Sequence, residues 1–163
     1  MSRRGIIWPV AAVSRALAAF ALTLGFLAGG VQAQDSLIVK ESPHSVADTL
    51  DRLAVAAEEK GLKVFSRVDH AAGAETAGLD LRPTQLLVIG NPKVGTPLMQ
   101  ADQRMALSLP LRIASWQDED GSVWVGYWSP EVFAVQYGVS GQAERLKKMA
   151  DALDGLTNAA IAE

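Results

Sequence analysis

Hydrophobic residues recur along the chain with two different spacings. Val46, Leu50, Leu53 and Ala57 are three or four positions apart, which predicts a helix with one buried stripe. The segment 36–42 before it has the apolar and β-branched residues of a short strand. The helical spacing returns near the C-terminus at Ala143, Leu146, Met149, Leu153, Leu156 and Ala160. The chain therefore combines strands with two long amphipathic helices.

Four further segments have the patterns of strands. Residues 62–68 alternate between apolar and polar, which predicts a strand with one well-buried face. Residues 85–90 are apolar without alternation and predict a central strand that is covered on both sides. Segments 109–116 and 122–128 flank the turn residues 118–121, so we expect an antiparallel hairpin.

Polar residues next to these segments indicate where helices begin. Ser45 followed by Asp48 has the form of a capping box. Asp69 is placed to cap a short helix that starts at the next residue. Thr96 and Pro97 have the residue types of an N-cap and a first helical position, so we expect a third helix to start there.

The predicted order is strand, helix, strand, short helix, strand, helix, hairpin and helix. This order is typical of an α+β protein. We predict a two-layer α/β sandwich with a mixed sheet of about five strands and helices on one face.

Residues 1–33 have the composition of a cleavable signal peptide. Arg3 and Arg4 form a positive start, residues 16–27 are apolar, and small residues lead to a cleavage site after Ala33. The apolar run is shorter than the ~20 residues that a membrane-spanning helix needs. We therefore expect a periplasmic or secreted protein without stable membrane insertion after cleavage.

The remaining residues, 34–163, have the length of a single domain. Their twelve basic and eighteen acidic side chains give a formal charge of −6, which argues against nucleic acid as a partner. The chain has no cysteine, which excludes disulfides, thiol nucleophiles and thiolate metal sites.

Several sequence blocks occur together in a recognisable order. They are Phe-Ser-Arg-Val-Asp-His-Ala at 65–71, Gly-Leu-x-Leu-Arg-Pro at 78–83, Gly-Asn-Pro-x-x-Gly-Thr-Pro-Leu-Met at 90–99, Leu-Pro-Leu-x-x-x-x-Trp-x-Asp-x-x-Gly at 109–121 and Tyr-x-x-Pro at 127–130. With these blocks the chain resembles the DUF302 domain, also called TT1751-like, over about residues 37–155. The resemblance implies a small two-layer α/β fold. It implies no catalytic residue, cofactor or substrate.

Asp69 and His70 are the residues with the strongest catalytic potential. Histidine titrates near neutral pH, and a carboxylate from Asp69 or Asp118 could orient it as a general base in a hydrolase-type enzyme. The alternative is that Asp69 only caps a helix and His70 is structural. Two histidines without cysteine do not predict a metal site, and no cofactor is predicted.

The segment 90–96 follows an apolar strand and precedes a helix. Its backbone N–H groups, together with Lys93, Gly95 and Thr96, could contact an anion. It lacks the residue order of a nucleotide-binding P-loop. Arg67 could form a surface ion pair or contact a ligand carboxylate.

Aromatic residues gather in the hairpin, at Trp116, Trp124, Tyr127 and Trp128. Cross-strand aromatic pairs stabilise such ribbons. If Trp124 and Trp128 share an outer face, they would instead provide a platform for a ligand or for a second copy of the chain.

We therefore expect an exported ligand-binding or accessory module that holds an unknown small molecule or protein partner. The expected site lies where segment 90–96, the pair 69–70 and the hairpin meet. Its candidate ligand-binding residues are Arg67, His70, Asn91, Lys93, Gly95, Thr96, Trp116 and Asp118. An enzyme based on His70 and a homodimeric interaction module based on the hairpin are the alternatives.

Overall fold

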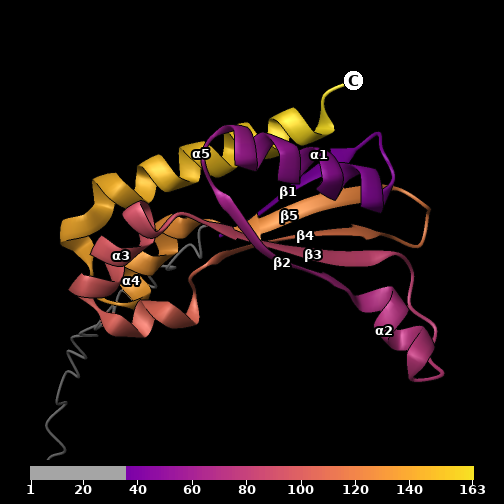
Figure 1. Ribbon diagram of the computed structural model, residues 1–163, viewed down its shortest axis with the longest axis horizontal. Helices are drawn as coiled ribbons and strands as arrows, with labels where there is room; N and C mark the ends of the chain where they lie inside the picture. Colours follow the sequence, from indigo (N-terminus) through magenta and orange to yellow (C-terminus); the bar gives the residue numbers. More distant parts are fainter. Residues whose placement is uncertain (1–35) are drawn as a thin grey trace, which may run out of the picture. The chain divides into compact units, whose positions relative to one another are not determined.

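The computed structural model describes residues 36–163, which form a five-stranded sheet with two long helices on one face (Figure 1). The strands are β1 (Leu37–Ser42), β2 (Lys63–Asp69), β3 (Thr84–Gly90), β4 (Leu111–Gln117) and β5 (Val123–Trp128). The helices are α1 (Val46–Glu59), α2 (His70–Thr76), α3 (Pro92–Ala101), α4 (Phe133–Gln136) and α5 (Ala143–Ile161), with 3-10 turns η1 (Gln103–Leu107), η2 (Pro130–Val132) and η3 (Ser140–Gln142). The expected signal peptide, residues 1–33, lies outside the described residues.

The strand order is β1-β5-β4-β3-β2, and every neighbouring pair is antiparallel. The prediction of five strands with helices on one face is confirmed, but the prediction of a mixed sheet is wrong. Strands β1 and β2, which α1 connects, run in the same direction. They occupy opposite edges, with three strands between them, so this strand–helix–strand unit forms no parallel pair.

Helices α1 and α5 lie side by side over the sheet and bury the core (Figure 1). Leu50 and Leu53 of α1 and Leu156 of α5 are inaccessible or nearly so, as are Ile89 and Ile113 of the sheet beneath them. The two apolar stripes predicted from their helical spacing therefore face the sheet.

Two cationic side chains on the edge strands fasten the helices to the sheet. The Lys40 Nζ on β1 donates to the Asp154 Oδ1 at 2.7 Å and the Thr157 Oγ1 at 2.8 Å, both on α5. On the opposite edge, Arg67 of β2 forms an ion pair with Asp51 of α1. Each long helix is thus attached to a different edge of the sheet.

Most of the predicted helix starts are confirmed. The Ser45 Oγ accepts from the backbone N–H of Asp48 at 3.1 Å, and the Asp69 Oδ1 accepts from that of Ala72 at 2.9 Å. The prediction for Thr96 is wrong. Helix α3 begins five residues earlier, because Asn91 and Pro92 also supply a cap and a first helical position, and Pro97 lies inside the helix.

The predicted burial of two strands also needs correction. β2 is an edge strand, and a bulge between Val64 and Ser66 interrupts its alternation, so Val68 is 39% exposed and the expected buried face is absent. β3 lies inside the sheet as predicted, but it is covered on one face and not on both. Leu87 and Ile89 are buried on the covered face, and no helix lies over the other face.

The sheet face opposite α1 and α5, which we call the outer face, is unusually apolar. One row across all five strands joins Val39, Gly126, Ala114, Leu86 and Val68 in direct register. Antiparallel sheets with one covered face usually place polar residues on the other. This row departs from that rule.

Tryptophans border the row on the outer face. Trp116 and Trp124 are direct cross-strand partners on one side, and Trp128, 59% exposed, lies on the other. The Trp116 ring lies over Gly126, where a Cβ would be 3.0 Å from both the Trp116 Cη2 and the Ile38 carbonyl oxygen. Gly126 therefore makes room for the indole.

We predict that Gly126→Ala lowers the free energy of unfolding by about 1–3 kcal/mol, because the added methyl displaces the Trp116 ring or the β1 backbone. Gly155→Ala is the control: its Cβ would have no neighbour within 4 Å in α5, so helix propensity should raise stability by about 0.5–1 kcal/mol. Urea unfolding of both variants measures the two changes in the free energy of unfolding. A Gly126→Ala variant as stable as the unmodified protein would contradict the packing of Trp116 on Gly126.

Candidate functional site

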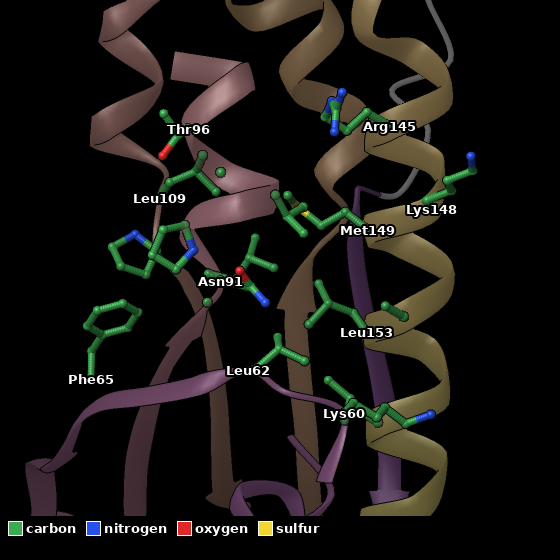
Figure 2. Close-up of a pocket in the computed structure, with 18 of the residues that line it drawn as sticks. Lys60, Leu62, Phe65, Asn91, Thr96, Leu109, Arg145, Lys148, Met149 and Leu153 are labelled. Atoms are coloured by element: carbon green, nitrogen blue, oxygen red, sulfur yellow. The ribbon is translucent and has the colours of Figure 1, made fainter. Parts of the chain in front are cut away.

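A pocket of about 520 Å³ opens at one end of the sheet, between α3, α5 and the end of β3 (Figure 2). Its wall is mostly apolar, and its polar residues are few. The apolar residues include Leu62, Phe65, Val94, Met99, Leu109, Pro110, Leu111, Met149, Leu153 and Leu156. The polar and cationic residues are Lys60, Asn91, Thr96, Arg145 and Lys148.

The length of α5 explains why a pocket forms there. Its nineteen residues span about 28 Å, whereas strands of six or seven residues span about 20–23 Å. The N-terminal end of α5 extends past the end of the sheet, beside α3 and α4 (Figure 1). Its inner side faces a space that no strand fills.

The segment after β3 supplies the opposite wall. The Asn91 Oδ1 accepts from the Lys93 N–H at 2.9 Å, and its Nδ2 donates to the Gly61 carbonyl at 3.0 Å, so Asn91 joins the start of α3 to the end of α1. At Gly90 a Cβ would lie 3.4 Å from Phe65 and from Pro110. These close contacts shape the pocket mouth.

The cations of the pocket differ in how they are engaged. Lys148 forms an ion pair with Glu144 at 2.8 Å, which lowers the pKa of the Glu144 carboxyl below its usual value. Within the described part of the chain, the Arg145 Nε donates one long hydrogen bond of 3.3 Å, to the Gln142 Oε1. In Figure 2 Arg145 extends from α5 toward the pocket, while the Lys148 ammonium points away from it.

Of the candidate ligand-binding residues, Asn91, Gly95 and Thr96 line the pocket. Lys93 lies in the first turn of α3 outside the lining. The expected junction with Asp69 and His70 does not form. Asp69 pairs with Gln85 at one end of β3, and segment 90–96 begins at the other end, about 17 Å away along the strand.

The catalytic candidates lie on the exposed side of α2. Asp69 caps that helix and also accepts from the Gln85 Nε2 at 2.9 Å. The His70 ring is exposed and, among the described residues, forms no hydrogen bond with a carboxylate. It lacks the contact that would orient a general base.

The remaining candidates have structural partners. The Arg67 guanidinium donates to Gln85 and to the Ala47 carbonyl besides its pair with Asp51. Trp116 packs on the outer face, far from the pocket lining.

Asp118 organises the hairpin turn. Its Oδ1 accepts from the backbone N–H groups of Asp120 and Ser122, each at 3.0 Å, and its Oδ2 accepts from the Trp124 Nε1 at 2.6 Å. The hydrogen bond from Trp124 lowers the pKa of the Asp118 carboxyl below its usual value, and the two backbone hydrogen bonds add to this effect.

Sequence reasoning missed the residues that build most of the pocket. Leu109, Met149 and Leu153 have the spacing of ordinary core residues, and Arg145 is one charged residue among several on α5. The spacing of Arg145, Lys148, Met149, Ala152, Leu153 and Leu156 along one side of α5 was the available signal.

Within residues 36–163, no helix is long and apolar enough to cross a membrane. In the same part of the chain, no three His, Asp or Glu side chains are grouped so that they could hold a metal ion.

The comparison with family models decides the family. The model described as "Domain of unknown function DUF302" matches residues 38–159. The chain belongs to the DUF302 family. The resemblance based on the sequence blocks is thereby confirmed.

A solved DUF302 structure supports the fold. The "uncharacterized conserved protein DUF302 from Bacillus stearothermophilus" superposes with a TM-score of 0.71, covering 77% of this chain and 98% of that one. At 16% sequence identity this likeness shows the DUF302 fold alone.

Relatives of this DUF302 chain include longer proteins that are named as ion channels. "Fluoride-specific ion channel FluC 1" of Brucella suis biovar 1 (strain 1330) is 46% identical over 103 residues, which are 63% of this chain and 41% of that protein. The protein of the same name from Brucella abortus biovar 1 (strain 9-941) matches with the same identity over 38% of its length. The chain thus spans about two fifths of the relatives it matches.

The lowered pKa of Asp118 gives a prediction with a defined sign. The carboxylate stabilises the folded state above its unfolded pKa of about 3.9, and this contribution is lost as pH falls through the lower folded pKa. We expect Asp118→Asn to reduce the urea midpoint at pH 7, with the difference from the unmodified protein shrinking toward pH 3. Asp120→Asn should change the midpoint little at pH 7, because no hydrogen bond reaches its carboxylate in the described residues. An Asp118→Asn effect of equal size at both pH values would contradict the assignment.

Proposed function

We propose that this DUF302 protein is an exported module that binds a small, mostly apolar molecule in the pocket between α3 and α5. The pocket itself is the observation that carries the proposal. Its volume of about 520 Å³ lies within the ~300–1,000 Å³ typical of small-molecule sites. An apolar wall with a few polar groups at its margin is also typical of such sites.

Other features of the chain support an exported binding module. The leader-like pattern of residues 1–33 and the absence of cysteine suit a protein that leaves the cytoplasm without disulfides. His70 is exposed and has no carboxylate hydrogen-bond partner within residues 36–163, which favours binding over hydrolysis. The match to part of longer proteins named as fluoride-specific ion channels fits an accessory role beside a transport protein.

The binding proposal is tested with a neutral fluorescent probe, N-phenyl-1-naphthylamine, which brightens in apolar sites. We expect saturable binding of one probe per chain. Ala152→Trp should weaken this binding at least tenfold, because Ala152 lies exposed on the α5 wall and an indole there would fill the pocket.

Ala159→Trp is the matched control, an exposed alanine on the same helix outside the pocket lining. It should leave probe affinity unchanged. Equal affinity of the unmodified protein and the Ala152→Trp variant would place the probe elsewhere and refute the proposal.

The apolar outer face favours a second candidate function, self-association into a homodimer. The face measures roughly 24 by 20 Å from strand spacing and length, so two copies would bury about 1,000 Å². Specific interfaces bury about 1,200–2,000 Å², which predicts weak association. Although residues 34–163 carry a charge of −6, this face presents both Glu41 and Arg112, so a two-fold pairing can bring opposite charges together.

We expect sedimentation velocity to show concentration-dependent dimers in the micromolar range. Trp128→Glu should shift the equilibrium to monomer, because it places a charge at the most exposed aromatic position of the face. Val55→Glu, on the exposed side of α1, should not change it. A protein that stays monomeric at 200 μM would exclude the dimer.

A further inference from the structure

The wall that α5 contributes to the pocket changes in polarity along the helix. Its lining residues are Arg145, Lys148, Met149, Ala152, Leu153 and Leu156. Each of these positions has another of them three or four residues away, so they lie along one side of the helix and form one stripe. Cationic residues begin the stripe and apolar residues complete it. A ligand lying along α5 would meet a cation at one end and hydrocarbon beyond it.

The charge of the pocket is opposite to that of the protein. Among the described residues 36–163, no Asp or Glu lines it, although residues 34–163 carry a formal charge of −6. Lys60, Arg145 and Lys148 are its charged residues. Apolar surface next to such cations favours a negative group on the ligand, because the low-dielectric wall strengthens their attraction.

Arg145 is the cation best placed to receive that group. Lys148 is already paired with Glu144, and its ammonium points away from the pocket in Figure 2. Lys60 caps the C-terminal end of α1, where the helix dipole is negative and Glu58 and Glu59 precede it. Arg145 has one weak hydrogen bond and no carboxylate partner within residues 36–163. Its guanidinium can bind a carboxylate or phosphate with two parallel hydrogen bonds.

Resting on the binding function proposed above, we infer that the ligand is an amphipathic anion. Its carboxylate or phosphate head contacts Arg145, and its apolar body extends along α5 toward Leu153 and Leu156. At about 30 Å³ for a water-sized group, the pocket accommodates roughly seventeen non-hydrogen atoms. A medium-chain acyl group with its head fits this limit.

The test is competition against the bound neutral probe by decanoate and by 1-decanol, which share a chain and differ in charge. We expect decanoate to compete about tenfold better in the unmodified protein. Arg145→Gln should abolish that advantage without changing the affinity for decanol, because only the head contact is removed. Raising NaCl from 50 to 300 mM should weaken decanoate binding and leave decanol binding unaltered.

Lys147→Gln is the matched control, since Lys147 lies on the same helix but is paired with Asp151 outside the pocket. It should preserve the preference for decanoate. Equal competition by decanoate and decanol, or an unaltered preference in Arg145→Gln, would overturn the amphipathic anion while leaving the binding module intact. Absence of probe binding would instead refute the proposed function, and this inference with it.

Two further competitors identify the source of the head group. Decanoate stands for a free carboxylate, and decyl phosphate stands for a phosphorylated amphiphile. Phosphatidylglycerol vesicles present a phosphate within a membrane. Competition by either soluble anion supports the inference. Binding to vesicles without competition by a soluble anion would overturn it in favour of a membrane surface.

Discussion

The packing of α5 on one face of the sheet is the contact on which the rest of the structure depends. Its C-terminal half, with Leu153 and Leu156, closes the core together with α1. Lys40 attaches this half to the outermost strand through Asp154 and Thr157. Because the helix is roughly 5–8 Å longer than the strands beneath it, at least its first turn extends beyond them. The pocket lies beside that extension, and its lining continues along α5 to Leu153 and Leu156.

Local signals in the sequence were sufficient for much of the fold. The caps at Ser45 and Asp69 are hydrogen bonds to backbone N–H groups only three residues away. All the residues that decide such a cap are therefore neighbours in the sequence. Thr96 shows the limit of such reasoning. Asn91 with Pro92 is an equivalent cap, and the sequence does not show which of two competing starts has the better tertiary support. The antiparallel order likewise depends on which strands occupy the edges, which no short segment encodes.

The candidate site was less accessible from the sequence than the fold. Polar motifs directed attention to Asp69, His70 and Asp118. The partners of the two carboxylates are backbone groups, Gln85 and Trp124, and the His70 ring is exposed. The pocket wall instead comes from apolar residues of separate segments, and their spacing is identical to that of core residues. Only the difference in length between α5 and the sheet leaves some of them uncovered. That difference becomes visible once the elements are assembled.

The bulge in β2 has a consequence for how copies of this chain can meet edge to edge. At Phe65 the strand leaves its ladder with β3, and bulges of this kind twist an edge away from further pairing. Continuous fibres built by strand addition need two usable edges in every copy. With β2 distorted, β1 is the edge that retains a regular ladder geometry. If copies pair only through β1, a pair of copies has no free regular edge left for a third. The bulge therefore limits the length of any sheet that these chains could share.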